Sequence, residues 1–243
     1  SPTSVTSYLS VISKGSAVFI LVIVLTTLFR VIQPMWQEVL YATSILTMTI
    51  GNLFAIRHQN VKRFLAFSSI AQAGFIMLGI VGGTALGMAT VIYFVLVYVF
   101  SNLAAFGVVQ AIEQASGKVT LDDYNGLYKT NPKLSLVMML ALFSLAGIPP
   151  LAGFFGKFFL FTAVAESGFY VLLGVAVLNT VISLYYYLLV VKAMFINSSN
   201  TPVTAFTSDM AMRISLVVCS VGILVIGFYS PVFAYIKELC VGI

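Results

Sequence analysis

The chain has 243 residues, of which 60% are hydrophobic and only 8% are charged. Soluble domains carry about 25% charged and about 45–50% apolar residues, so this composition excludes an ordinary soluble enzyme, a disordered chain and a nucleic-acid-binding protein. The formal net charge of +5 forms no basic patch, because the 12 Lys and Arg residues are spread along the sequence. The remaining class is a polytopic membrane protein, whose outer surface is solvated by lipid.

Long apolar stretches define the expected fold. A bilayer core about 30 Å thick needs about 20 apolar residues per helix, and about seven stretches meet that requirement. The sequence therefore predicts an all-α membrane helix bundle that forms a single domain over residues 1–243. The acidic turn and Pro132 in the long connection 113–133 favour a short surface helix there. The predicted spans are 4–30, 38–56, 64–82, 88–112, 134–163, 169–196 and 212–236.

Basic residues are distributed unequally between the two ends of these spans. Only Arg30 and Lys237 fall at one end, whereas eight basic residues fall at the other. Basic loops favour the cytoplasmic side, so we expect the start of the chain to be cytoplasmic and its C-terminus to be outside. The chain begins with Ser1 rather than Met and shows no signal-peptide pattern, so we also expect it to be part of a longer protein. The eight basic residues at the expected cytoplasmic end are Arg57, Lys62, Arg63, Lys118, Lys129, Lys133, Lys192 and Arg213.

Two lysines fall inside predicted spans, whereas every acidic residue falls at a span end or in a loop. Lys14 lies near the middle of 4–30, where an unpaired charge costs at least about 2.5 kcal/mol. Ser10 precedes it by one helical turn and shares its face, which gives Lys14 a small polar surrounding. One interpretation is a structural lysine that neighbouring carbonyls or hydroxyls satisfy. The other is a protonatable site on an ion path.

Lys157 follows a segment that a regular helix cannot cross. The run AGIPPLAGFFGK at 146–157 contains two adjacent prolines, which remove two backbone donors, so the span 134–163 is expected to be broken at Gly-Ile-Pro-Pro. Ion-coupled transporters use broken helices at their sites, and the positive end of the second half-helix disfavours an ammonium. The alternative is a packing kink from which Lys157 extends outward. The residues of the break are Gly147, Pro149, Pro150 and Gly153.

Other polar side chains in the spans are candidates for a hydrated route. They recur at four-residue spacing, which places each pair on one helical face. None titrates near neutrality, so we expect them to support water rather than to act as relay sites; ordinary interhelical hydrogen bonding is the alternative. These candidates are Ser68 with Gln72, Tyr98 with Asn102, and Asn179 with Ser183, together with Ser10 beside Lys14.

The sequence predicts neither a metal site nor a redox cofactor in this chain. Cys219 and Cys240 lack Cys-x-x-Cys spacing, and His58 is the single histidine. A dinucleotide-binding fingerprint is also absent from the sequence.

Three segments resemble a known family. NVKRFLAFSSIAQAGF at 60–75 and SLAGIPPLAGFFGKFFLF at 144–161 are similar to signatures of the proton-translocating antiporter-like membrane subunits. SPTSVTSYLSVISK at 1–14 resembles the segment that ends in the buried lysine of that family. Such subunits occur in NADH:quinone oxidoreductase (respiratory complex I), its photosynthetic relatives and Mrp-type sodium/proton antiporters. The resemblance covers essentially the whole chain, although many members carry histidine where this chain has Gln72.

The resemblance implies a fourteen-helix subunit built from two inverted repeats, of which this chain is spans eight to fourteen. It implies proton translocation through Lys14 and Lys157, driven by quinone reduction elsewhere in a complex. NADH, flavin, iron–sulfur clusters and quinone are then expected in other subunits. The expected partners are other membrane subunits and the lipid bilayer of a bacterial inner membrane, not nucleic acid. Two alternatives stay open: a sodium/proton antiporter subunit without a redox partner, and a structural membrane scaffold.

Overall fold

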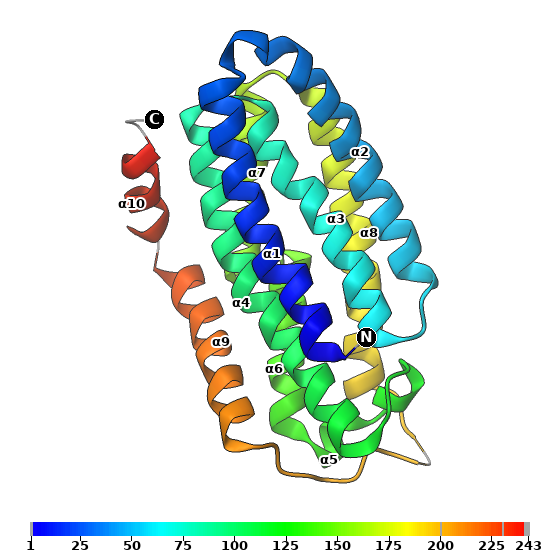
Figure 1. Ribbon diagram of the computed structural model, residues 1–243. Helices are drawn as coiled ribbons and strands as arrows, with labels where there is room; N and C mark the ends of the chain where they lie inside the picture. The colour runs from blue at the N-terminus through cyan, green and yellow to red at the C-terminus, as the bar shows by residue number, and fades with distance from the viewer. Residues whose placement is uncertain (1, 200, 230, 241–243) are drawn as a thin grey trace.

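The computed structural model describes residues 2–199, 201–229 and 231–240, and this part of the chain forms an α-helical bundle without β-strands (Figure 1). Six of its helices are long and apolar enough to cross a membrane. Two shorter helices, α6 and α7, each 15 residues long, follow one another through the bundle and form a further crossing. The predicted all-α membrane bundle is confirmed.

The helix bounds agree with most of the predicted spans. A π-helical turn at Val24–Leu28 and a 3₁₀ turn at Arg30–Ile32 connect the first two helices. The helices are α1 (Thr3–Ile23), α2 (Gln33–Arg57), α3 (Val61–Val81), α4 (Ala85–Ser116), α5 (Leu127–Thr130), α6 (Pro132–Ala146), α7 (Ala152–Glu166), α8 (Tyr170–Phe195), α9 (Met210–Phe228) and α10 (Pro231–Cys240).

The last predicted span, 212–236, is wrong in its extent. The long helix α9 ends at Phe228, and the separate helix α10 begins at Pro231. Proline has no N–H with which to continue a helical hydrogen-bond ladder, so a helix boundary at this residue has a direct physical cause. The apolar composition on both sides of the boundary conceals it from a search for long hydrophobic stretches.

The connection between α4 and α6 contains the expected surface helix, the single turn α5, preceded by a 3₁₀ turn at Asp122–Tyr124. Asp123 organises this connection by accepting hydrogen bonds from the backbone N–H groups of Thr120 (2.8 Å) and Val119 (3.2 Å). Partial burial acts to raise the pKa of Asp123, but the hydrogen bond from the Thr120 hydroxyl, together with these two backbone hydrogen bonds, outweighs burial and holds its pKa below the ordinary value. The carboxylate therefore stays ionised and fixes the loop.

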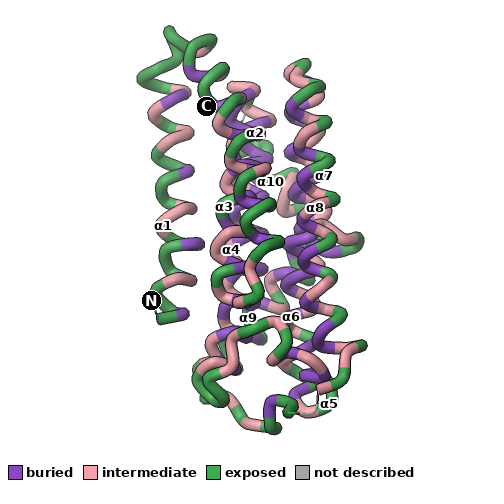
Figure 2. The backbone as a smooth tube through the Cα atoms, turned by 90° about the vertical axis from the view of Figure 1, so that its right-hand side faces the viewer, coloured by how far each residue is buried: buried purple, intermediate pink, exposed green. Residues whose placement is uncertain are grey.

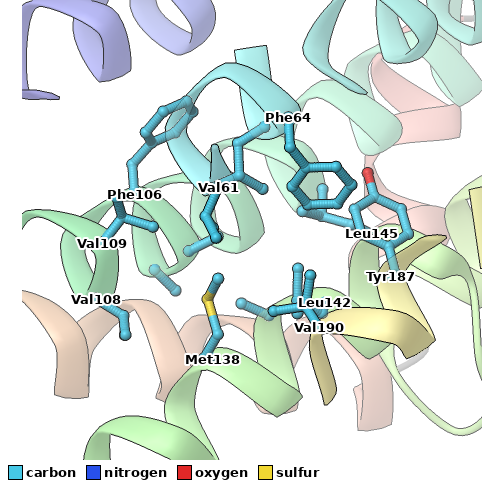
Figure 3. Packing of buried hydrophobic residues seen from close by; sticks show 14 of the residues in the cluster. Val61, Phe64, Phe106, Val108, Val109, Met138, Leu142, Leu145, Tyr187 and Val190 are labelled. Carbon is cyan, nitrogen blue, oxygen red and sulfur yellow. The ribbon is translucent and has the colours of Figure 1, made fainter. Parts of the chain in front are cut away.

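Helix α4 is the centre of the bundle and is buried along most of its length. It packs against α1, α3, α6, α7, α9 and α10. Figure 2 shows the buried positions concentrated on the inner helices, whereas α1 is largely exposed, as expected of a helix that faces lipid or a partner. The largest hydrophobic cluster joins α3, α4, α6 and α8 and includes Phe64, Phe106, Met138 and Tyr187 (Figure 3).

Small residues bring α2 and α3 into backbone contact. A Cβ added at Gly51 would lie 2.6 Å from the backbone nitrogen of Ala71, and one added at Gly74 would lie 2.7 Å from that of Met48. Such close approach is typical of helix packing in membranes. It holds α3, which carries Ser68, Ser69 and Gln72, closely against α2.

Candidate functional site

Lys157 is buried where the broken crossing changes from α6 to α7, with only 3% of its surface exposed. Its Nζ donates a hydrogen bond of 3.1 Å to the carbonyl oxygen of Ala146, the last residue of α6, and lies 4.8 Å from the centre of the Phe75 ring. The alternative in which Lys157 extends outward is therefore wrong. The ammonium also contacts the negative, carbonyl end of α6. The sequence predicts only that Lys157 lies near the positive end of α7, so its contact with the carbonyl end of α6 is a finding of the structure.

Gly147 ends α6 with a left-handed conformation, φ +86°. Its N–H donates to the carbonyl oxygens of Phe143 and Ser144, and the N–H of Ile148 also donates to Phe143, each at 3.0 Å. This is the hydrogen-bond pattern of a Schellman motif, which satisfies carbonyls that a helix end leaves free. Glycine suits the position because a Cβ disfavours positive φ.

The remaining break residues follow as the sequence predicts. Pro149 and Pro150 separate the two helices, and α7 starts at Ala152. Gly153 lies so close to α6 that an added Cβ would fall 1.7 Å from the carbonyl oxygen of Ser144. The break is therefore a tightly packed junction, and it directs Lys157 back toward the end of α6.

Lys14 is half-buried on α1, and its Nζ donates hydrogen bonds to the carbonyl oxygen and to the hydroxyl of Ser69 on α3, the latter at 2.8 Å. The same nitrogen lies 5.4 Å from the centre of the Tyr98 ring. The ammonium of each lysine thus donates to a backbone carbonyl and also lies over an aromatic ring. Among the described residues the ion pair is Lys62 with Glu113, so no carboxylate neutralises either lysine. These contacts of Lys14 fit both the structural and the ion-path interpretation.

Three predicted polar residues assemble beside Lys14. The Tyr98 hydroxyl donates to the carbonyl oxygen of Ser10 at 2.9 Å. The side-chain nitrogen of Asn102 donates to the Tyr98 hydroxyl at 2.9 Å and to the Ser10 hydroxyl at 3.4 Å. Their helical spacing was visible in the sequence, and the structure adds that they join α4 to α1.

Two further predicted residues connect α3 to the broken crossing. The Ser68 hydroxyl is hydrogen-bonded to the hydroxyl of Tyr187 on α8. The side-chain nitrogen of Gln72 donates to the Tyr187 hydroxyl at 3.2 Å and to the carbonyl oxygen of Leu145 at 3.4 Å. Leu145 is adjacent in sequence to Ala146, which holds Lys157, so this group reaches the environment of the second lysine.

A small cavity lies between the surroundings of the two lysines. Its volume of about 10 Å³ is close to the minimum that accommodates one water molecule. The hydroxyls of Ser101 and Ser144 in its wall are hydrogen-bonded to each other at 2.7 Å. Sequence reasoning missed these serines and Ser69, because single hydroxyls in apolar spans are a weak signal. The cavity is lined by Gln72, Phe94, Val97, Tyr98, Ser101, Ser144, Leu145 and Gly153.

The structure does not bring Asn179 and Ser183 to the lysines. Asn179 belongs to a separate buried group between α2 and α8, where the side-chain nitrogen of Asn52 donates to its carbonyl oxygen (3.0 Å) and to its Oδ1 (2.9 Å). The Tyr186 hydroxyl donates to Oδ1 of Asn52 at 2.8 Å. Ser183 donates within its own helix, to the carbonyl oxygen of Thr180. Asn179 therefore makes an ordinary contact between helices, and Ser183 makes an ordinary contact within one helix.

Replacing Tyr186 with phenylalanine is expected to lower the free energy of unfolding by about 1 kcal/mol, because buried Asn52 loses a hydrogen-bond donor. The measurement is the thermal unfolding midpoint of the purified protein in detergent. Tyr185→Phe is the matched control, since the neighbouring Tyr185 is 57% exposed. Equal midpoints for the two variants would contradict a stabilising role for this hydrogen bond.

Comparisons with known proteins place this geometry in a family. The model of the family described as NADH:quinone oxidoreductase/Mrp antiporter, transmembrane, matches residues 1–183. NADH-quinone oxidoreductase subunit N of Phocaeicola vulgatus is 54% identical over 99% of this chain and 51% of its own length. NAD(P)H-quinone oxidoreductase subunit 2 of a Synechococcus species is 40% identical over 96% of this chain and 46% of its own length. The chain thus spans about half the length of these curated relatives.

Solved structures agree with this assignment. A chain of respiratory complex I from Thermus thermophilus is 34% identical, with a TM-score of 0.71 over 80% of this chain and 44% of its own length. A chain of the Mrp complex from a Dietzia species has a TM-score of 0.85 over 93% of this chain and 50% of its own length; at 21% identity it shows the fold alone. The chain therefore belongs to the NADH:quinone oxidoreductase/Mrp antiporter transmembrane family.

Proposed function

We propose that this chain is the C-terminal half, spans eight to fourteen, of a subunit N-type membrane subunit of an NADH:quinone oxidoreductase, in which it carries protons through Lys14 and Lys157. The 54% identity to a subunit N over nearly the whole chain supports this proposal. The tyrosine-rich segment 181–195, VISLYYYLLVVKAMF, favours the N type over the M type. Quinone reduction, in other subunits, supplies the energy.

The observation that supports the proposal is a series of polar contacts that lies between the surroundings of the two lysines. Lys14 contacts Ser69 and the Tyr98 ring, Tyr98 lines the small cavity, and Gln72 reaches from that cavity toward the end of α6 that holds Lys157. Inside a protein, like charges repel more strongly than in water. A proton on one lysine therefore disfavours a proton on the other, and the charge moves between them in steps.

The surroundings proposed for the chain follow from its charge distribution and its relatives. The starts of α3, α6 and α9 and the ends of α2, α4 and α8 lie at the end of the bundle that carries α5 (Figure 1). Eight basic residues accompany these helix ends, which supports a cytoplasmic location for this end in a bacterial inner membrane. The proposed partners are other membrane subunits of the complex and lipid.

The second candidate is an Mrp-type sodium/proton antiporter subunit. The matched family also includes Mrp antiporters, and the fold is shared with the Dietzia Mrp complex, whereas the 54% identity to a subunit N supports the first candidate. The absorbance spectrum of the purified assembly distinguishes the two. Flavin and iron–sulfur bands that co-purify with the chain are expected for an NADH:quinone oxidoreductase, whereas an assembly without them would favour the antiporter.

Lys14→Met tests the ion path against a structural scaffold. Methionine keeps the unbranched stem but cannot hold a proton, so we expect proton translocation to fall strongly in the assembled complex while NADH oxidation by an artificial electron acceptor continues. Translocation is measured as acidification of membrane vesicles. Full translocation in this variant, particularly with unchanged or increased stability, would contradict the ion path and support the scaffold.

A further inference from the structure

A cavity of about 320 Å³ lies between the start of α6 and the loop that leads into α9. Two cations, Lys133 and Arg213, line it, and none of the described residues in its wall is acidic. Its location is the end of the bundle that carries α5, where Figure 1 shows the loop before α9 running beneath the helices. The cavity lies away from the two lysines of the crossing, and the proposed ion path does not use it.

Hydrogen bonds hold the cavity in shape. Asn131, with 6% of its surface exposed, donates to the carbonyl oxygen of Thr204 at 3.2 Å and accepts from the backbone N–H of Phe206 at 3.3 Å. It thereby fixes the loop against the start of α6. On the opposite side, Nε of Arg213 donates to the carbonyl oxygen of Ser208 at 2.8 Å, which holds the guanidinium at the cavity wall.

The electrostatics of the cavity favour an anion. Neither Lys133 nor Arg213 takes part in an ion pair within the described residues. The nearby Asp209 is outside the lining, and its carboxylate caps α9 by accepting from the N–H of Met210 at 2.7 Å. The first turn of α6 has no side-chain cap, so its positive dipole end adds to the two cations. The guanidinium of Arg213 and the ammonium of Lys133 line the same cavity, and both groups donate hydrogen bonds to phosphate oxygens in proteins.

Exposed apolar side chains follow the cavity one turn further along both helices. Leu136, one turn beyond Lys133 on α6, is 45% exposed, and Val217, one turn beyond Arg213 on α9, is 60% exposed. A ligand with an anionic phosphate and long acyl chains satisfies both parts of this surface at once, whereas a free phosphate satisfies only the first. We infer that this cavity is a binding site for the phosphate headgroup of an anionic phospholipid.

The test uses the assembled complex in neutral detergent and a photoactivatable phosphatidylglycerol. Crosslinks to the peptides that contain 131–136 and 206–213 are quantified by mass spectrometry. Each basic residue near a membrane surface strengthens anionic lipid binding by about fivefold, so the double variant K133Q/R213Q is expected to bind about thirtyfold more weakly. The matched control is R63Q/K192Q, which removes one Arg and one Lys at the same end of the bundle but outside the cavity.

Three outcomes would overturn the inference. The first is equal crosslinking by a phosphatidylcholine analogue with the same acyl chains, and the second is equal loss in R63Q/K192Q and K133Q/R213Q. The third is displacement of phosphatidylglycerol by millimolar inorganic phosphate, which would assign the cavity to a free anion. If the double variant fails to assemble, the single variants Lys133→Gln and Arg213→Gln give the same test, each with an expected loss of about fivefold. The test does not depend on proton translocation.

Discussion

Replacing Lys157 with alanine is expected to reduce proton translocation through this chain by about a hundredfold or more, which is the lower range of what a positioned proton-transfer group contributes. The reason is that Lys157 is the protonatable side chain at the broken crossing, and its Nζ is held by Ala146 beside the polar group around Gln72. Fluorescence quenching of a pH-sensitive dye in inverted membrane vesicles measures the loss. NADH oxidation with an artificial acceptor should continue, because this chain is proposed to carry no redox centre.

Two further variants separate the loss of the proton site from the loss of structure. Lys157→Met keeps most of the buried volume and removes the charge, so it should behave like Lys157→Ala. Lys237→Ala removes an exposed lysine on α10, outside the proposed path, and should translocate protons normally. Normal translocation by an assembled Lys157→Met complex would show that Lys157 is a structural residue.

Gly153→Ala is expected to destabilise the protein by about 3 kcal/mol, at the upper end of the usual cost of overpacking. The added methyl would fall 1.7 Å from the carbonyl oxygen of Ser144, and neither backbone segment can yield without opening the junction between α6 and α7. We therefore expect a lower thermal unfolding midpoint in detergent and less assembled complex in membranes. Since the junction also orients Lys157, any complex that assembles should translocate protons poorly.

The control for this substitution is Gly174→Ala on α8. An added Cβ at Gly174 meets no atom within 4 Å, so alanine should be tolerated or should stabilise the helix slightly. A Gly153→Ala protein with the same unfolding midpoint as Gly174→Ala would contradict the tight junction at the break.

The features that the sequence predicted are those that depend on short stretches of chain. Long apolar runs located the membrane helices, because side-chain hydrophobicity over about 20 residues is read within one stretch of chain. Pro149 with Pro150 located the break, because proline disrupts the helical backbone at its own position. The boundary before Pro231 was missed, since apolar residues lie on both sides of it. Lys14 and Lys157 were found as candidates because a charge within an apolar span is conspicuous.

The contacts around the candidate residues depend on which helices become neighbours, and a single sequence does not contain that information. Ser101 and Ser144 are 43 residues apart, yet their hydroxyls meet in the wall of the same cavity. Conversely, Asn179 shows the same helical spacing as the other polar candidates but packs against Asn52 instead of the lysines. The orientation of Lys157 toward the end of α6 likewise required the three-dimensional junction.

The number of protons translocated per NADH oxidised is the most direct measure of a proton path through the two lysines. It is determined in proteoliposomes that contain the assembled complex, with the wild-type chain, Lys14→Met or Lys157→Ala. A shared path predicts that both variants lose the same number of protons per NADH, because interruption at either lysine stops the same flow. An unchanged ratio in either variant, with the complex assembled and NADH oxidation intact, would contradict that path.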